Sequence, residues 1–287
     1  MQKIKKLKIL VTGSDGQLGQ SIKNLKSGFP EYDFVFTDVE DLDITDEKSV
    51  LEFFQLTAPD VCINAAAYTA VDKAETEKQL CTLINKTGPK NLALACEKLN
   101  SRLIHISSDY VYDCCDSEIL TENSPVTPKS WYAISKLEGE REIINTFQNY
   151  QIIRTSWLYS EYGNNFVKTI IRLAGERDEL KVVNDQTGSP TYAGDLALAI
   201  LMIADNFKYK GIYNYSNLGF ISWFDFAKEI IKLKNIKCIL IPVSTEEYPT
   251  PAPRPKNSRL SKQKIQNDFG IRIPEWNESL KICIERL

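Results

Sequence analysis

The sequence predicts an α/β protein built on a doubly wound parallel sheet, with a smaller lobe interleaved toward its C-terminal end. Short apolar runs typical of buried strands alternate with longer stretches of helical periodicity through residues 8–154. A glycine-rich turn separates the first such strand from the first helix. Sheets of this class bind ligands at the carboxyl ends of their strands, so we expect the functional residues at that edge.

The expected elements follow one another regularly in the first half of the chain. The predicted strands are Lys8–Val11, Phe34–Thr37, Val61–Asn64, Arg102–Ser107 and Gln151–Arg154. The predicted helices of this half are Leu18–Leu25, Lys48–Leu56, Asn85–Lys98 and Ala133–Asn145. Two further helices, Gly194–Asp205 and Trp223–Lys232, are predicted in the second half.

The second half is less regular and contains a loop at Asn184–Thr191 and a proline-rich stretch at Pro249–Pro255. This stretch is too short for an independent linker. We therefore expect residues 1–158, with 190–208 returning to them, to form the sheet domain. Residues 159–189 and 209–287 are expected to form the smaller lobe.

Composition excludes several classes of protein. The 35 Lys and Arg are interspersed with 38 Asp and Glu, so the basic stripe of a nucleic-acid-binding protein is missing. No apolar run approaches the roughly 20 residues that span a bilayer, and Ile9–Val11 is too short for a secretory signal. We therefore expect a cytoplasmic protein without nucleic-acid or membrane partners.

The residues that build metal sites and disulfide frameworks are also sparse. Seven cysteines are dispersed, and the one close pair, Cys114 and Cys115, is vicinal, which disfavours zinc sites and disulfides. The single histidine, His105, lies inside a predicted strand. We predict no metal site.

Three glycines follow the first predicted strand at i, i+3 and i+6, namely Gly13, Gly16 and Gly19, with Gln17 and Leu18 between the last two. Such glycines let the backbone turn tightly and approach a pyrophosphate, whose charge the following helix N-terminus stabilises. A glycine-rich turn without a ligand is the alternative, which the strand before it and the helix after it disfavour. The motif predicts a dinucleotide-binding, Rossmann-type domain.

Acidic residues after the second predicted strand fit the adenosine end of a dinucleotide. Asp38 lies roughly twenty residues beyond the glycines, where a carboxylate accepts hydrogen bonds from the ribose. It would repel a 2′-phosphate, so we expect NADH to be accepted. Asp43 is a candidate for the adenine amino group, although Asp43 or Asp46 can instead cap the helix near Lys48. The small side chains of Ala65–Ala67 leave room for the cofactor to cross.

Tyr132 and Lys136 are four residues apart on a predicted helix, so the phenol and the ammonium share one face. A nearby cation is expected to lower the pKa of the phenol and make it a better proton donor. Reduction of a ketone requires such a proton on the developing alkoxide. Tyr-x-x-x-Lys also occurs by chance in helices, so this pair needs support from elsewhere.

That support comes from Ser108, which ends a predicted strand at the edge where the site is expected. Its hydroxyl can donate to a substrate carbonyl or share a proton with Tyr132, although polar residues at strand ends also cap loops. The order glycine loop, strand-end serine, Tyr–Lys helix favours an NADPH- or NADH-dependent reductase.

With these residues the chain resembles the dTDP-4-dehydrorhamnose reductase family of the extended short-chain dehydrogenases/reductases, from the glycine loop nearly to the C-terminus. The most specific matching segments are Asn64–Glu75, Arg154–Tyr159, Asn184–Thr191 and Pro249–Leu260. The resemblance implies reduction of the C4 ketone of dTDP-4-dehydro-L-rhamnose, with the smaller lobe binding the dTDP-sugar.

The resemblance also implies site residues. The dinucleotide would be lined by Gly16, Gln17, Leu18, Asp38, Asp43, Ile44, Ala67, Tyr68 and Thr69. Tyr132 and Lys136 would carry the proton, and Ser108, Asp109 and Trp157 would meet the sugar. Arg254 would contact the nucleotide diphosphate or form a surface salt bridge, and Trp157 has the alternative of being core. The position before Asp109 is usually threonine in this family, and Ser108 keeps its hydroxyl.

Some relatives form dimers bridged by magnesium held by glutamates. The stretch Thr191–Asp195 contains no glutamate, so we expect a monomer or a homodimer without a bridging metal.

Three other interpretations stay open. A 4,6-dehydratase or epimerase shares the glycine loop and the Tyr–Lys pair, but dehydratases carry a proton-abstracting Glu after the Asp, where this chain has Tyr110. A reductase that forms another deoxyhexose is a second possibility. The third is a non-catalytic subunit like the beta subunit of methionine adenosyltransferase, which the presence of Ser108, Tyr132 and Lys136 disfavours.

Overall fold

A six-stranded parallel sheet forms the centre of the computed structural model, which describes residues 6–112, 118–206 and 208–287. Its strands lie in the order β10-β5-β4-β3-β1-β2. They are β1 (Leu7–Thr12), β2 (Tyr32–Thr37), β3 (Val61–Asn64), β4 (Arg102–Ser108), β5 (Tyr150–Thr155) and β10 (Gly211–Tyr215). The strand order reverses between β1 and β3, where this class of fold opens a crevice at the carboxyl ends of the strands.

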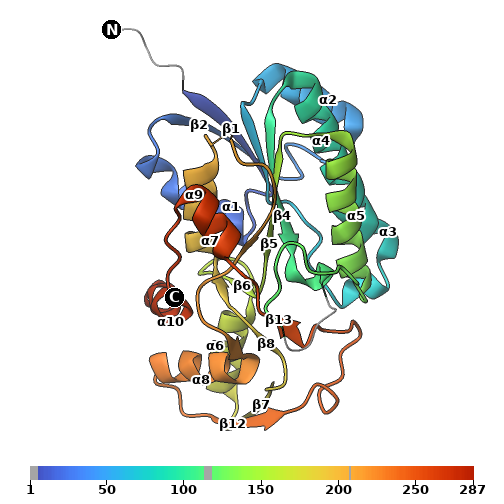
Figure 1. Cartoon of the computed structure of the whole chain (residues 1–287). Coiled ribbons are helices and arrows are strands. Elements are labelled where there is room, and N and C mark those ends of the chain that lie inside the picture. The colour runs from blue at the N-terminus through green and yellow to red at the C-terminus, as the bar shows by residue number, and fades with distance from the viewer. Residues whose placement is uncertain (1–5, 113–117, 207) are drawn as a thin grey trace.

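Helices cover both faces of the sheet (Figure 1). One face carries α1 (Gln17–Leu25), α7 (Ala193–Ile203) and α9 (Gln263–Phe269), and the other carries α2 (Glu47–Thr57), α4 (Gly88–Leu99) and α5 (Trp131–Thr146). Side chains of a strand alternate between its faces: Ile9 and Val11 pack toward α7, whereas Leu10 packs in the core beneath α2 and α4. The predicted doubly wound parallel sheet is confirmed.

The smaller lobe has its own core. Its elements are α6 (Phe166–Glu176), β7 (Glu179–Val183), α8 (Trp223–Leu233), β12 (Ile239–Val243) and α10 (Trp276–Glu285). Strands β7 and β12 pair in parallel, and Val167, Phe226 and Leu280 are buried between the helices and this pair. Short strands frame the junction with the sheet: β6 (Leu158–Tyr159), β8 (Thr187–Gly188), β9 (Thr191–Tyr192), β11 (Ile221–Ser222) and β13 (Asn257–Ser258).

The structure differs from the sequence prediction in two places that matter for the site. Strand β10 pairs with β5 in the large sheet, although we expected residues 209–287 in the smaller lobe. Its sequence, Gly-Ile-Tyr-Asn-Tyr, lacks the continuous apolar run of the other strands, and Asn214 is nevertheless fully buried. The helix expected from Asn85 instead begins with α3 (Lys78–Thr82), which passes through a π-helical turn, Leu83–Thr87, into α4. The remaining bounds of the predicted two-lobe division stay a prediction.

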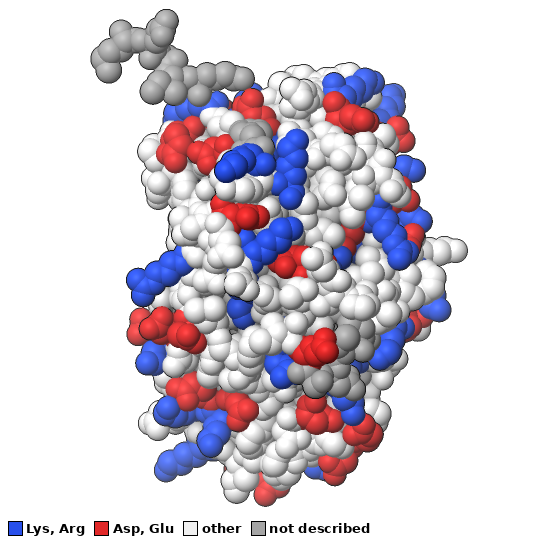
Figure 2. All heavy atoms as spheres, viewed as in Figure 1, with Lys and Arg blue, Asp and Glu red and all other residues white. Residues whose placement is uncertain are grey.

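Acidic and basic side chains are intermixed on the face shown in Figure 2. Among the described helices, none is both long and apolar enough to cross a membrane. The described residues contain no group of three or more His, Cys, Asp or Glu arranged to hold a metal ion.

Five cysteines are described and all are free, while Cys114 and Cys115 lie outside the described residues. His105 lies on β4, fully buried, and its Nδ1 is 3.0 Å from Asn64 Nδ2. Burial holds the pKa of its imidazole well below the usual value, as a structural position in a strand predicts.

Candidate active site

The glycine motif forms a cradle between β1 and α1. Gly13 has a φ of +65°, and a Cβ there would lie 2.5 Å from the Ala66 amide nitrogen, so the tight turn requires glycine. A Cβ on Gly19 would collide with the backbone of Ser14. A Cβ on Gly16 would meet only the Gly13 carbonyl, at 3.4 Å, so the protein itself leaves room at Gly16 for a ligand to approach.

The N-terminus of α1 offers unpaired backbone donors to an anion. Gly16 is the N-cap, no side chain caps the helix, and its first turn has no acidic residue. The Gln17 side chain is occupied elsewhere, because its Oε1 accepts from Ser160 Oγ and Asn165 Nδ2, both at 3.0 Å. The Leu18 side chain is in the core, at 4% exposure. Leu18 can therefore meet a phosphate only through its backbone amide, and the Gln17 amide lies beside it at the start of the helix, which fits a pyrophosphate.

A cavity of about 250 Å³ adjoins this cradle. Of the predicted cofactor residues it is lined by Gly13, Gly16, Asp38, Asp43, Ile44 and Ala67. The Asp38 carboxylate accepts from the amides of Asp15 at 2.9 Å and Val39 at 2.8 Å. Each carboxylate oxygen keeps a lone pair for a ribose hydroxyl.

Asp46 and Asp43, the two candidates for the cap of the helix near Lys48, have different roles in the structure. Asp46 is the N-cap of α2 and accepts from the amides of Lys48 and Ser49. Asp43 does not cap the helix: its Oδ1 accepts from the Thr45 amide at 2.9 Å and hydroxyl at 2.7 Å. Asp43 thus faces the cavity, where it is available to an adenine amino group.

The loop after β3 is held from behind by Asn85 of the π-helical turn. Asn85 Oδ1 accepts from the Tyr68 amide at 2.9 Å, and its Nδ2 donates to the Tyr68 carbonyl at 3.1 Å. The Tyr68 hydroxyl donates to Glu77 at 2.7 Å, and Thr69 is exposed. Asn85 Nδ2 also donates to Ser135 Oγ on α5 at 3.0 Å. Asn85 therefore joins the loop after β3, which is expected to border the cofactor, to α5, the helix that carries Tyr132.

Tyr132 and Lys136 lie on the first turns of α5, which Ser130 caps by accepting from the Ala133 amide at 3.2 Å. Tyr132 is partly exposed, and Lys136 is buried at 2% exposure. The Lys136 ammonium donates to the Ile106 carbonyl of β4 at 2.7 Å.

The expectation that Lys136 lowers the pKa of Tyr132 is wrong for this state of the protein. Burial raises the pKa of Tyr132 to about 12, while its hydrogen bond with Ser108 opposes the rise. The Lys136 ammonium points to a carbonyl instead, and burial lowers its own pKa to about 8. Tyr132 therefore keeps its proton near neutral pH, as a general acid must.

Ser108 and Asp109 lie beside Tyr132 where β4 ends. Ser108 Oγ donates to Asp109 Oδ1 at 3.0 Å and accepts from the Tyr110 amide at 3.2 Å. Asp109 is buried at 2% exposure, and this burial raises the pKa of its carboxyl to about 6, against hydrogen bonds with Ser258 and Ser108. The structure thus brings together Tyr132, Ser108 and Asp109, three groups that can exchange protons.

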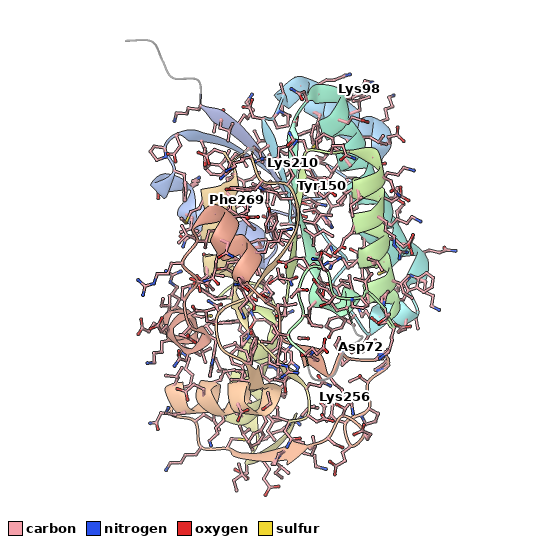
Figure 3. The ribbon with its side chains drawn as sticks, in the orientation of Figure 1. Asp72, Lys98, Tyr150, Lys210, Lys256 and Phe269 are labelled. Atoms are coloured by element: carbon pink, nitrogen blue, oxygen red, sulfur yellow. The ribbon has the colours of Figure 1, made fainter. Side chains whose placement is uncertain are left out.

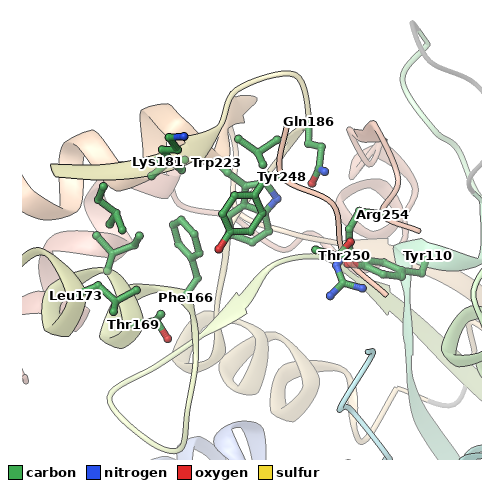
Figure 4. Close-up of a pocket in the computed structure, with 14 residues that line it drawn as sticks. Tyr110, Phe166, Thr169, Leu173, Lys181, Gln186, Trp223, Tyr248, Thr250 and Arg254 are labelled. Carbon is green, nitrogen blue, oxygen red and sulfur yellow. The ribbon is translucent and has the colours of Figure 1, made fainter. Parts of the chain in front are cut away.

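A second cavity, of about 310 Å³, opens in the smaller lobe (Figure 4). Phe166, Trp223 and Tyr248 gather in its middle, and Arg254 lies beside Tyr110 at one end. Tyr110 packs edge to face on Tyr132 with ring centroids 5.6 Å apart. Tyr110 therefore lies between this cavity and Tyr132.

Arg254 both lines this cavity and makes the ion pair that was its alternative. Its Nη2 donates to Asp72 Oδ2 at 2.8 Å, and Asp72 lies at the boundary between the sheet domain and the smaller lobe (Figure 3). Trp157 is half-buried and stacks on Trp223, with ring centroids 3.6 Å apart. It is therefore neither a plain core residue nor fully open to solvent.

Three residues with a part in this site were missed in the sequence. Tyr110 was considered only as the replacement for a glutamate, and Trp223 only as the start of a helix. Asn85 was considered only as a helix residue. A single residue carries no sequence signal of contacts that are 22 to 66 positions away, as these three are, so the sequence held little that points to these roles.

Comparisons with known proteins agree with this geometry. The family model described as RmlD substrate binding domain matches residues 7–287. The dTDP-4-dehydrorhamnose reductase of Aggregatibacter actinomycetemcomitans is 41% identical, over 96% of this chain and 97% of that protein. A spore coat polysaccharide biosynthesis protein of Bacillus subtilis is 39% identical, over 96% of this chain and 95% of its own length.

Solved structures of similar proteins superpose over nearly the whole chain. The dTDP-4-dehydrorhamnose reductase of Clostridium acetobutylicum is 46% identical, with a TM-score of 0.93 over 97% of this chain and 98% of that one. The enzyme of Bacillus anthracis, in complex with NADP, is 40% identical, with a TM-score of 0.94 over 98% of this chain and 100% of that one. The chain belongs to the dTDP-4-dehydrorhamnose reductase family.

Proposed function

We propose that this protein reduces the C4 ketone of dTDP-4-dehydro-L-rhamnose to dTDP-L-rhamnose with NADPH or NADH, in nucleotide-sugar biosynthesis. The observation that carries this proposal is the hydrogen bond between Tyr132 and Ser108 at the carboxyl edge of a sheet whose first turn forms a glycine cradle, with Lys136 one helical turn beyond Tyr132. The NADP complex of the Bacillus anthracis relative supports the choice of cofactor.

Gly16 and the backbone amides of Gln17 and Leu18 would hold the pyrophosphate of the cofactor, with Asp38 and Asp43 toward its adenosine. Ala67, Tyr68 and Thr69 would border the rest of the dinucleotide. When bound, the nicotinamide supplies the hydride. Side chains of this protein would orient the substrate and transfer the proton.

Tyr132 would donate its proton to the alkoxide that develops at C4. Its pKa of about 12 keeps it protonated beforehand, and the Lys136 ammonium would stabilise the phenolate that forms. In this structure Ser108 donates its hydroxyl proton to Asp109 at 3.0 Å. With substrate bound, the Ser108 hydroxyl would turn to donate to the carbonyl oxygen and hold it beside the Tyr132 hydroxyl. Holding the reacting groups in place is itself a large part of such a rate enhancement.

The cavity of the smaller lobe would take the nucleotide part of the substrate. Its aromatic wall of Phe166, Trp223 and Tyr248 suits a pyrimidine base, and Arg254 at one end suits a diphosphate. The sugar would then extend past Tyr110 toward Tyr132, where Trp157 can contact it. Tyr110 has no carboxylate, which disfavours the proton abstraction of a dehydratase.

We also propose that the protein acts in the cytoplasm, as a monomer or a homodimer without a bridging metal. The five described cysteines are free thiols, which suits a reducing compartment. Asp195, the carboxylate in the stretch considered for metal binding, instead accepts from Asn217 at 2.7 Å and from Ser279 at 2.5 Å.

The test is to incubate the pure protein with dTDP-4-dehydro-L-rhamnose and either NADPH or NADH and to follow the absorbance of the reduced nicotinamide. We expect stoichiometric oxidation and a dTDP-6-deoxyhexose product that nuclear magnetic resonance identifies. No oxidation with either cofactor would leave a binding subunit as the better assignment.

Tyr132→Phe should reduce turnover by about 100-fold or more, the scale of lost general acid catalysis, while its affinity for NADPH stays unchanged in fluorescence titration. Trp276→Phe, an aromatic change on α10 at a residue that lines neither cavity, is the matched control and should keep full activity. Unchanged turnover in Tyr132→Phe would remove Tyr132 from the mechanism.

A further inference from the structure

Trp157 has an unusual backbone conformation at the point where the chain leaves the sheet. It follows β5, precedes β6, and has a φ of +49°, which a bulky residue adopts only when its surroundings impose it. Its carbonyl accepts from the Thr191 amide at 3.2 Å, which ties this turn to β9. The backbone of Trp157 is therefore fixed, and adjustment is left to its side chain.

Two neighbours define where the Trp157 indole lies. On one side it stacks on Trp223, with ring centroids 3.6 Å apart and an interplanar angle of 14°. On another side is Gly188, where an added Cβ would lie 3.0 Å from Cε2 and Cζ2 of the indole. The indole thus lies against an aromatic ring and a backbone without a side chain, and it leaves no free space at either contact.

Trp223 belongs at the same time to the wall of the 310 Å³ cavity in the smaller lobe, together with Phe166 and Tyr248 (Figure 4). Its ring centroid is 4.5 Å from that of Phe166. Trp157 is not among the residues that line this cavity. The Trp223 indole therefore separates the cavity from Trp157, the residue expected to meet the sugar.

The backbone at Trp223 is firmly held. It is the first residue of α8, and Ser222 and Asp225 form a capping box around it: Ser222 Oγ accepts from the Asp225 amide at 3.0 Å, and Asp225 Oδ2 accepts from the Ser222 amide at 3.2 Å. A ligand that presses on Trp223 can then move its ring but not its backbone. Because the two rings are in contact, such a movement is passed to Trp157.

We propose that Trp223 is a positioning residue that makes the placement of the Trp157 indole depend on occupancy of the cavity by the nucleoside of the substrate. This inference rests on the proposed function, since it takes the cavity as the nucleotide site. Its consequence is that the nucleotide, although remote from the ketone, raises kcat as well as affinity, because binding energy gained there is used to orient the sugar.

The first experiment follows the tryptophan pair by circular dichroism. Two stacked indoles couple their transitions, so the wild-type spectrum should contain an exciton couplet that Trp157→Phe and Trp223→Phe each abolish and Trp276→Phe retains. Titration with dTDP, with NADP⁺ present, should change the couplet at the same half-saturation that calorimetry gives for dTDP binding.

A couplet that stays constant at saturating dTDP would overturn the inference and leave the reductase assignment untouched. Failure of dTDP to bind at all would overturn it as well, since the nucleoside would not be the occupant of the cavity. Reductase activity is measured separately, so the two failures are distinguishable.

The second experiment separates positioning from mere contact with the substrate. Trp223→Leu should lower kcat for dTDP-4-dehydro-L-rhamnose by about 10-fold or more, the scale of a misplaced reacting group, with the affinity for NADPH unchanged. Trp223→Phe, which keeps an aromatic platform, should restore most of kcat. A rise in KM with kcat intact in Trp223→Leu would mean that Trp223 only lines the cavity and would reject the proposal.

Gly188→Ala tests the same placement from the other side of the ring and does not depend on folding of Trp223→Leu. Its methyl group would lie 2.8 Å from Ser258 Cβ and 3.0 Å from the Trp157 indole, so it should shift the couplet without dTDP and lower kcat. The couplet reports the indole alone, because Ser258 does not contribute to it. Trp276→Phe again serves as the control and should change neither quantity. A wild-type couplet and wild-type kcat in Gly188→Ala would contradict the role given to the position of Trp157.

Discussion

At the scale of single residues, burial dominates the proton chemistry of the site. It raises the pKa of Tyr132 to about 12 and of Asp109 to about 6, and it lowers that of Lys136 to about 8. All three shifts disfavour the charged form, as removal from water does. Tyr132, the proton donor, thus stays protonated near neutral pH. Lys136 is the group whose charge changes close to neutral pH and affects the reaction.

We expect kcat to fall as the pH rises through about 8, because the ammonium of Lys136 is lost there and a neutral amine no longer stabilises the phenolate. The pKa of Tyr132 is too high for its own ionisation to account for this fall. In Lys136→Arg the charge persists beyond pH 10 or so, so the alkaline fall in its pH–rate profile should move upward. If the alkaline fall stays at the same pH in Lys136→Arg, it must be caused by the ionisation of another group.

Asp38 sets the electrostatics of the adenosine end. Asp38→Asn removes a negative charge from the cavity wall while keeping an oxygen for the Val39 amide, so we expect the ratio of kcat/KM for NADPH to that for NADH to rise about 10-fold, the scale of one charged contact. Steady-state kinetics with both cofactors measures the ratio. Glu40→Gln, a neighbouring exposed acid, is the control. An unchanged ratio in Asp38→Asn would show that Asp38 does not face the ribose.

At the scale of elements, α5 is the helix that positions the catalytic groups, and it is anchored on two sides. Gly139 lets it approach the π-helical turn so closely that a Cβ would collide with the Asn85 carbonyl. Glu140 forms a bidentate pair with Arg154 of β5, at 2.9 and 2.6 Å, with both side chains at most 3% exposed. These contacts fix α5 against both the π-helical turn that holds the loop after β3 and the sheet.

Glu140→Gln should lower the free energy of unfolding by about 3–5 kcal/mol, because it leaves the buried guanidinium of Arg154 without its countercharge. Urea unfolding followed by circular dichroism measures this change. Glu138→Gln removes a carboxylate from the same helix, where it pairs with the partly exposed Lys86 and Arg141. Its effect should stay below about 1 kcal/mol. Equal losses in both variants would contradict the anchoring role of Glu140.

At the scale of the whole molecule, polar contacts hold the two lobes around the site. Arg254 pairs with Asp72, and the Ala252 amide donates to the same carboxylate at 3.2 Å. On the other side, Ser160 and Asn165 donate to Gln17 at the start of α1. The lobe that would bind the substrate is thus attached directly to the loop after β3, through Asp72, and to α1, through Gln17.

Arg254→Gln should raise KM for the dTDP-sugar by about 10-fold or more, the scale of one lost charge-assisted contact, with little change in the affinity for NADPH. Asp72→Asn keeps the guanidinium and should have a smaller effect. If Arg254 serves only as a bridge between lobes, the two variants will behave alike in steady-state kinetics. Lys256→Gln, at an exposed ion pair nearby, should leave KM unchanged.

The sequence by itself determined the elements that local physics specifies. Apolar runs, glycine spacing and helix periodicity predicted the five strands from β1 to β5 and the turn at Gly13–Gly19, because steric and hydrophobic constraints act over a few residues there. The i, i+4 spacing of Tyr132 and Lys136 put them on one helix face for the same reason. These features need no information from distant parts of the chain.

The tertiary structure alone decided which distant groups meet and how far each is removed from water. The pairing of β10 with β5, the stack of Trp157 on Trp223 and the ion pair of Arg254 with Asp72 join segments 60 to 182 positions apart. The pKa of Tyr132 was misjudged from sequence because the direction of the Lys136 ammonium and the depth of the phenol depend on packing. Burial and long-range contact are properties of the assembled chain, which no local pattern encodes.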